Sequence, residues 1–294
     1  MASTTGPTAY ERHAPDPRLV SRSLASSRPA PFWLEDVPRR PARAPLRGGT
    51  STDLLVVGGG YTGLWAAIHA RLRDPGRRVV VLEARRTGWA ASGRNGGFCE
   101  ASLTHGEANG RSRWPEEYDT LHELGLRNLD ELEADVERLG VDAQLRRTGS
   151  LTVAVEPYQV AELEGSEGFL DTAAVRARID SPLFLAGVHD AEETALVHPA
   201  RLAEGLAAAA SELGVEIFED SPARSLEASR DELVVRTDGG SVRAARVVLA
   251  TNAFPALLRR FRHIFCQIAD PLDIGDETLN LKTMPLLSHA EVPL

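Results

Sequence analysis

The sequence predicts an α/β fold built on a parallel sheet, and three neighbouring segments carry this prediction. Residues 54–57 (LLVV) form a short apolar run, which is typical of a parallel strand buried on both faces. Residues 62–73 follow with a helical pattern that ends at the Asp-Pro-Gly turn of residues 74–76. Residues 78–82 (RVVVL) form a second apolar run. Together these segments make one β-α-β unit of about 30 residues.

The rest of the chain continues to alternate between helical and extended patterns. Helices are expected at residues 115–139, 173–179 and 199–213, and strands at residues 144–155, 215–218, 233–237, 241–244 and 247–250. Pro115 suits the first helical position, Gly140 the C-terminal cap of the same helix, and Asp171 the N-terminal cap of the next. Asp-Gly-Gly at residues 238–240 predicts a hairpin turn.

Charge and cysteine content exclude several classes of protein. The 294 residues include 33 Lys and Arg and 42 Asp and Glu, for a formal net charge of −9. Such a chain does not neutralise a row of phosphates, so we expect no nucleic-acid partner. Two cysteines, Cys99 and Cys266, are too few for a disulfide framework and favour a reducing compartment. With no signal-peptide core and no apolar stretch near the ~18 residues of a membrane span, we expect a soluble cytoplasmic protein.

The loop after the first strand has the spacing of a phosphate-binding glycine motif. It reads Gly-Gly-Gly-Tyr-Thr-Gly, with Gly58 permitting the tight turn, Gly60 the close approach of a pyrophosphate, and Gly63 the packing of helix on sheet. The free amides at the start of the helix then hold negative charge. Glu83 ends the second strand, 20 residues after Gly63, where a carboxylate accepts hydrogen bonds from ribose hydroxyls. The motif in this context predicts an adenine dinucleotide site.

A second loop, at residues 84–97, favours FAD over NAD. It is small, polar and rich in glycine, and NAD does not require such a loop directly after the second strand. The ribityl chain and ring of a flavin continue past the pyrophosphate and need a loop that lies flat against them. We therefore expect FAD as the cofactor.

The segments DLLVVGGGYTGLWAA, VVVLEA and GWAASGRNGG resemble the FAD-dependent amine and amino-acid oxidoreductases of the D-amino-acid oxidase type, nearest to their γ-glutamylputrescine and glycine/sarcosine-like branch. Further segments fit the resemblance: RTGSL at residues 147–151, VHPARL at 197–202 and VVLATNA at 247–253. The resemblance covers roughly residues 32–262.

The resemblance implies a Rossmann-like FAD-binding domain (GR2-type) with an interleaved α+β substrate domain. It implies an enzyme that oxidises a small amine or amino acid by hydride transfer to the flavin. Oxygen or another acceptor then reoxidises the flavin. The implied cofactor-binding residues are Gly58, Gly60, Tyr61, Thr62, Gly63, Glu83, Ala84, Ser92, Gly93, Arg94, Asn95, Gly96, Gly97, Ala223, Ala250 and Thr251. No catalytic side chain is assigned, and no metal site is expected.

The chain divides into segments under this interpretation. Residues 1–50 lack periodicity and are expected to be extended or disordered, with the apolar residues 31–34 docking onto the body of the protein. The FAD-binding domain takes residues 51–105 and 196–262, the substrate domain residues 106–195 (partial), and a divergent tail residues 263–294.

The composition changes after Arg262, and the tail does not resemble the family, so the chain is expected to be truncated at its C-terminus. Two alternatives to an active oxidoreductase stay open. One is a catalytically incomplete FAD-binding remnant, and the other is an NAD-dependent dehydrogenase. Cys99 could tether a flavin covalently, but a free cysteine is usually an inert small hydrophobe. His198 could be catalytic, but its place before Pro199 favours a structural position at the start of a helix.

Overall fold

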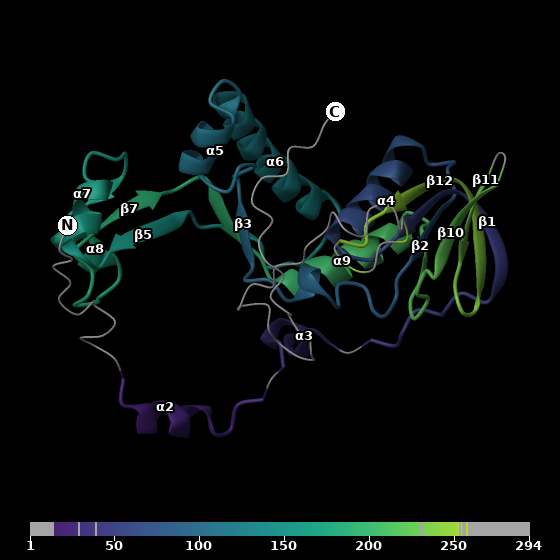
Figure 1. Cartoon of the computed structure of the whole chain (residues 1–294), viewed down its shortest axis with the longest axis horizontal. Coiled ribbons are helices and arrows are strands. Elements are labelled where there is room, and N and C mark those ends of the chain that lie inside the picture. The colour runs from purple at the N-terminus through teal and green to yellow at the C-terminus, as the bar shows by residue number, and fades with distance from the viewer. Residues whose placement is uncertain are drawn as a thin grey trace, which may run out of the picture.

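The computed structural model describes residues 15–257 except 29, 39, 230, 231, 253, 255 and 256. Its described strands form three sheets, one of six strands and two of three. The large sheet stands at one end of the molecule with α4 and α9 beside it, and the small sheets lie toward the other end (Figure 1). The divergent tail predicted at residues 263–294 lies outside the described residues.

The six-stranded sheet has the order β10-β11-β12-β1-β2-β9. Its members are β1 (Gly48–Val57), β2 (Val79–Leu82), β9 (Glu216–Phe218), β10 (Ser225–Ser229), β11 (Glu232–Arg236) and β12 (Gly240–Leu249). β12, β1, β2 and β9 run parallel, while β10 and β11 are antiparallel neighbours. The predicted α/β class with a parallel sheet is confirmed.

β2 and the last three residues of β1 are buried on both faces, as their apolar runs predict. Val56 and Val81 point to the face covered by α4 (Tyr61–Arg73) and α9 (Pro199–Glu212). Leu55 and Val80 point to the other face, where residues of β11, the first half of β12 and Leu46 cover them. Because the chain passes from β1 into α4 and the last residue of β1 pairs with the last residue of β2, the carboxyl ends of both strands lie beside the start of α4.

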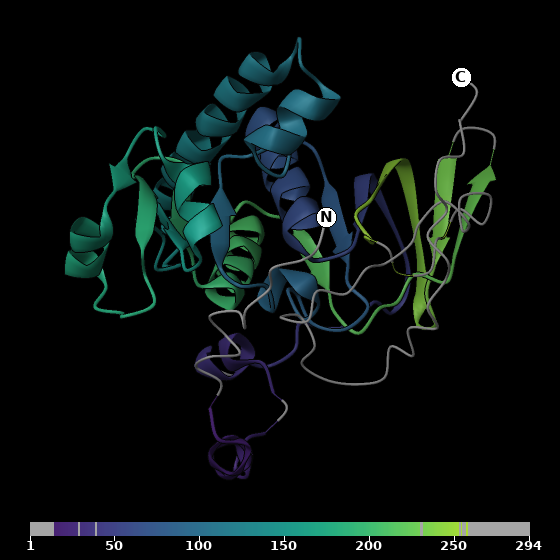
Figure 2. The ribbon, with the colours of Figure 1, turned by 60° about the vertical axis from the view of Figure 1, so that its left-hand side comes forward.

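The chain from β3 to β8 builds the second part of the molecule. Its sheets have the orders β3-β8-β4 and β5-β7-β6. The strands are β3 (Phe98–Glu100), β4 (Arg146–Arg147), β5 (Ser150–Ala154), β6 (Phe169–Leu170), β7 (Ala186–Asp190) and β8 (Thr194–Leu196). The helices are α5 (Glu107–Arg113), α6 (Tyr118–Arg138), α7 (Pro157–Leu163) and α8 (Thr172–Arg178). Figure 2 shows α5 and α6 standing above these sheets.

Several predicted elements change in the structure. The helix predicted from Pro115 begins instead at Tyr118, because that ring packs against Gly110 of α5 and lies under the Arg111 guanidinium, 4.3 Å from the ring centroid. The strand predicted at 144–155 is two strands in different sheets. The chain changes sheets at Gly149, which has φ 65° and meets the carbonyl of Asp190.

The hairpin turn at 238–240 is confirmed, but the two strands predicted after it are one continuous strand. β12 pairs in parallel with the whole of β1, from Gly48↔Gly240 to Val57↔Leu249. Gly140, with φ 65°, follows the end of α6, and the Asp171 carboxylate caps α8, both as predicted.

Part of the N-terminal segment is folded, so the expectation of an extended or disordered segment is wrong for those residues. They are α2 (Pro17–Leu24), α3 (Phe32–Asp36) and the start of β1. The expected docking of residues 31–34 is confirmed, since the Trp33 and His198 ring centroids lie 4.8 Å apart.

Candidate cofactor site

The glycine loop, residues 58–63, joins β1 to α4 in a turn that leaves no room for side chains. Gly58 has φ 114°, and a Cβ there would lie 2.3 Å from the carbonyl oxygen of Ala250. A Cβ at Gly63 would lie 1.9 Å from the carbonyl oxygen of Gly58. The predicted structural roles of these two glycines, the tight turn and the close packing of helix on strand, are confirmed.

The start of α4 faces a hydroxyl from the next loop. The Tyr61 amide donates a hydrogen bond of 3.1 Å to Ser92 Oγ, and a Cβ at Gly60 would lie 2.8 Å from the same oxygen. Gly60 has an extended backbone (φ −85°, ψ −176°), and Thr62, one residue into the helix, is exposed. The amides of a first helical turn have no acceptor within the helix, and such amides are the groups that bind anions at helix N-termini.

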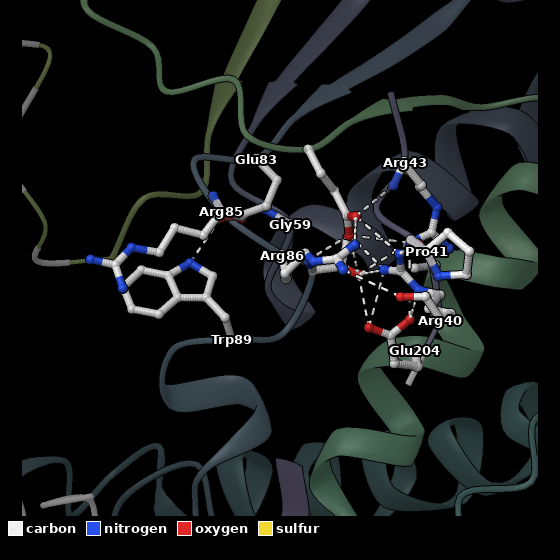
Figure 3. A network of polar contacts seen from close by, with 12 residues as sticks. Arg40, Pro41, Arg43, Gly59, Glu83, Arg85, Arg86, Trp89 and Glu204 are labelled. Atoms are coloured by element: carbon white, nitrogen blue, oxygen red, sulfur yellow. Dashed lines mark hydrogen bonds and ion pairs between the residues drawn. The ribbon is translucent and has the colours of Figure 1, made fainter. Parts of the chain in front are cut away.

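Glu83 lies at the carboxyl end of β2 with its side chain against the glycine loop (Figure 3). Its Oε2 accepts a hydrogen bond of 2.6 Å from the Gly59 amide. Its Oε1 accepts from the Arg85 amide and from the Trp89 indole, both at 2.9 Å. A carboxylate has about four acceptor positions. Glu83 therefore keeps one acceptor position free on Oε2, while both positions of Oε1 are occupied.

Trp89 forms an aromatic wall beside Glu83. The Arg85 guanidinium lies over the indole, 4.4 Å from its centroid, as Figure 3 shows. Phe254 packs on Trp89 with ring centroids 5.7 Å apart. Neither Trp89 nor Arg85 is among the cofactor-binding residues that the resemblance implies. The Trp89 indole N–H therefore links the loop of residues 84–97 to Glu83 at the end of β2.

The β2–β3 loop, residues 84–97, is held by its own polar groups. Arg94 Nε donates to the Trp89 carbonyl at 2.6 Å. Asn95 accepts from the Gly97 amide at 2.9 Å and donates to the Ala91 carbonyl at 3.1 Å. Gly97 has φ 79°, and its carbonyl accepts a hydrogen bond of 2.8 Å from the Val197 amide, in the segment that leads to α9. The loop is thus an ordered structure rather than a flexible surface segment.

The remaining predicted residues lie near the same edge of the sheet. Ala250 follows β12, donates its amide to the Val57 carbonyl at 2.8 Å and lies against Gly58, and Thr251 is the next residue along the chain. Ala223 follows β9, two residues after Ser221, whose amide donates to the Glu83 carbonyl at 2.8 Å. Ala84 and Gly96 are exposed, and Gly93 is buried. The structure brings the two loops and the ends of β1, β2, β9 and β12 together, as predicted.

Sequence reasoning missed Glu219, the acid at the end of β9. Its side chain is fully buried and accepts hydrogen bonds from Arg40, Arg86 and the Thr87 amide. Burial opposes ionisation, but the donors around it, with Arg40 the strongest, outweigh this and hold the pKa of Glu219 well below its usual range. The sequence contained one signal for it. Glu219 directly follows β9 as Glu83 directly follows β2, and the carboxyl ends of neighbouring parallel strands lie at the same edge of a sheet, so both acids are expected at that edge.

Two residues considered for chemistry have structural surroundings. Cys99 packs against the cluster of Ala101, Leu129 and Ala195, and burial raises the pKa of its thiol, which keeps it protonated. His198 is the N-cap of α9, where its Nδ1 accepts from the Arg201 amide at 3.2 Å. The predicted N-terminal helix position of His198 is confirmed.

Residues 53–271 match the protein family described as FAD dependent oxidoreductase (DAO). The chain belongs to this family. The resemblance stated from the sequence is therefore confirmed, and FAD is the cofactor of the matched domain. Because the family is FAD dependent, the alternative of an NAD-dependent dehydrogenase is wrong.

Two curated relatives carry names of oxidoreductases. Gamma-glutamylputrescine oxidoreductase of Escherichia coli (strain K12) is 33% identical over 221 residues, which are 71% of this chain and 51% of that protein. The probable oxidoreductase OrdL of Haemophilus influenzae is 29% identical over 240 residues, 74% of this chain and 53% of that protein. The chain thus spans about half the length of these relatives.

Solved structures share the fold at lower identity. Glycine oxidase from Geobacillus kaustophilus aligns with a TM-score of 0.61 and 22% identity, over 72% of this chain and 58% of that chain. L-amino acid deaminase from Proteus vulgaris aligns with a TM-score of 0.53 and 22% identity, over 74% of this chain and 50% of that chain. These alignments establish the fold of the DAO family for this chain. Among the described residues, no helix has the length and apolar content required to cross a membrane.

The site has the chemistry that FAD requires. The glycine loop is enclosed so tightly that a Cβ at Gly59 would lie 3.1 Å from both Glu83 and Thr87. The start of α4 supplies amides for a pyrophosphate, and Glu83 supplies an acceptor for a ribose hydroxyl. The residues present therefore fit the cofactor of the family.

Proposed function

We propose that this chain is an FAD-dependent oxidoreductase that oxidises a small amine or amino acid by hydride transfer to the flavin. The observation that carries the proposal is the glycine loop with Glu83 and the β2–β3 loop folded against it, in a chain of the DAO family. When bound, the flavin supplies the two-electron acceptor of the reaction. Oxygen or another acceptor then receives the electrons, and the protein works in the cytoplasm.

The residues of the chain have distinct proposed roles. Gly58, Gly60 and Gly63 admit the pyrophosphate to the start of α4, where the amides of Tyr61 and Thr62 face it. Glu83, with Ala84 after it, binds the adenosine ribose. Ala223 borders the adenine, while Ala250 and Thr251 close over the pyrophosphate. The flavin and ribityl side is lined by Ser92, Gly93, Arg94, Asn95, Gly96 and Gly97.

Cofactor binding is proposed to be non-covalent. Cys99 is turned into an apolar cluster and its thiol is held protonated by burial, so it is a poor nucleophile toward a flavin ring.

A reduction experiment tests the proposed reaction. The purified chain, loaded with FAD, is mixed anaerobically with a panel of small amines and amino acids, including γ-glutamylputrescine and glycine. We expect at least one compound to bleach the flavin absorbance, and air to restore it. A flavin that stays oxidised with every compound, while dithionite reduces it, would contradict the proposed oxidation and favour a remnant that only binds FAD.

Glu83→Ala should weaken FAD binding by about 1.5–3 kcal/mol, the usual worth of hydrogen bonds to a charged group. Loss of the carboxylate removes the ribose acceptor and also frees the Gly59 amide and the Trp89 indole. Titration of the FAD-free chain, followed by flavin fluorescence, measures the change. Glu227→Gln, in an exposed pair with Arg236, is the control and should bind FAD normally. Unchanged affinity in Glu83→Ala would remove this residue from the site.

A further inference from the structure

Residues 32–47, which we call the strap, run along the outside of the β2–β3 loop. α3 begins the strap and lies below α9 in Figure 1. Between α3 and Gly48, where β1 begins, the described residues (37, 38 and 40–47) form neither helix nor strand. Three sets of contacts fix the strap to the loop and to the sheet.

The first set joins α3 to the far end of the loop. A Cβ at Gly93 would lie 2.9 Å from Leu34 Cδ2, and one at Gly97 would lie 3.6 Å from Trp33 Cζ2. Asp36 Oδ2 lies 3.2 Å from His198 Nε2. Because Nδ1 of His198 accepts from the backbone of α9, its Nε2 carries the proton and donates to Asp36.

The second set joins Arg40 to the near end of the loop, as Figure 3 shows. Arg40 Nη2 donates to Thr87 Oγ1 at 2.8 Å and to Glu219 Oε1 at 2.5 Å, and its Nε donates to Glu204 of α9. Arg86 reaches back from the loop, with Nη2 donating to the Arg40 carbonyl at 3.3 Å. Glu219 therefore holds the strap and the loop through the same carboxylate.

The third set anchors the end of the strap in the sheet. The Leu46 amide donates to Ser221 Oγ at 2.8 Å, and the Leu46 side chain is 2% exposed within the apolar cluster of β1, β2 and β12. The strap is thus fixed at both ends and cannot move away from the loop as a unit without exposing apolar surface.

We propose that the strap positions the β2–β3 loop and thereby sets the affinity of the chain for FAD. The loop bears on the glycine loop directly, because the Gly88 amide donates to the Gly59 carbonyl at 3.0 Å and Ser92 Oγ meets the start of α4. A loop released by the strap withdraws these groups from the glycine loop and the start of α4, which the proposed function assigns to the cofactor. Leu34 and Arg40 are positioning residues in this account, and the effect on FAD rests on the proposed function.

Two variants of the full chain test the proposal, Leu34→Ala and Arg40→Gln. Amide hydrogen exchange of residues 84–97 is measured without FAD, and the dissociation constant for FAD is measured by flavin fluorescence. We expect faster exchange confined to the loop and its strap, and an FAD dissociation constant raised at least about tenfold. Leu34→Ala keeps the test valid if Arg40→Gln folds poorly.

Matched controls are available elsewhere in the chain. Leu19→Ala removes an exposed leucine of α2, and Arg224→Gln breaks the exposed pair with Asp238. Both should leave loop exchange and FAD affinity unchanged. Unchanged loop exchange in Leu34→Ala and Arg40→Gln would overturn the proposal, as would a uniform rise across the six-stranded sheet. Hydrogen exchange is measured on the FAD-free chain, so it reports on the strap and the loop even if the wild-type chain fails to bind FAD. Failure of the wild-type chain to bind FAD would contradict the proposed function, not the contact of the strap with the loop.

Discussion

Gly60→Val should abolish FAD binding while leaving most of the fold intact. Gly60 has an ordinary extended backbone, so valine can adopt its conformation without strain. The new side chain would project toward Ser92 Oγ, which lies 2.8 Å from the Cβ position, and would fill the space at the start of α4. We expect the FAD dissociation constant to rise at least ~100-fold, equivalent to about 2.8 kcal/mol.

Gly49→Val is the matched control for this substitution. Gly49 lies in β1, and the nearest atom to a Cβ there is Ser241 Oγ at 4.0 Å. Circular dichroism should be similar for both variants, and only Gly60→Val should lose the cofactor. FAD retained by Gly60→Val would show that the pyrophosphate binds elsewhere.

Glu219→Gln should lower the free energy of unfolding by about 3–5 kcal/mol, the usual cost of removing one partner from a buried ion pair. Glutamine replaces one of the two carboxylate oxygens with an NH2 group, which then faces donors: Arg40 and the Thr87 amide at the Oε1 position, or Arg40 and Arg86 at the Oε2 position. Urea denaturation measures the loss. Glu227→Gln, which removes the exposed partner of Arg236 on β10, should leave the free energy of unfolding nearly unchanged.

The pH dependence of this loss has a definite sign. The pKa of Glu219 is held well below the usual glutamate value of 4.5, so the folded chain binds a proton there less readily than the unfolded chain. Its contribution to stability is complete above that value and is lost as the pH falls toward the folded pKa. The gap between wild type and Glu219→Gln should be constant near neutral pH and shrink below about pH 4.5. A gap that stays constant in acid would contradict the buried charge.

The features that could be predicted from the sequence are those determined by short segments. Apolar runs predicted the strands around Val56 and Val81, and glycine spacing predicted the turn at Gly58, because both depend on neighbours within a few residues. The Asp-Gly-Gly turn was predicted for the same reason. The glycine loop and Glu83 were therefore placed correctly at one edge of the sheet.

The features that were missed depend on contacts between distant segments. Arg40 meets Glu219 across 179 positions of the chain, from a segment without any helical or strand period. The start of α6 is set by packing of Tyr118 on α5, which overrides the preference of Pro115 for a first helical position. No local pattern marks such contacts, so the strap could not be inferred from the sequence beyond the docking of residues 31–34.

The most direct test of the account is the flavin content of the purified full chain before and after acid precipitation. We predict a yellow protein with about one flavin per chain, and release of that flavin as FAD into the supernatant when the protein precipitates. A protein that stays colourless after incubation with FAD would contradict the glycine loop as a cofactor site, and colour that remains in the pellet would contradict non-covalent binding.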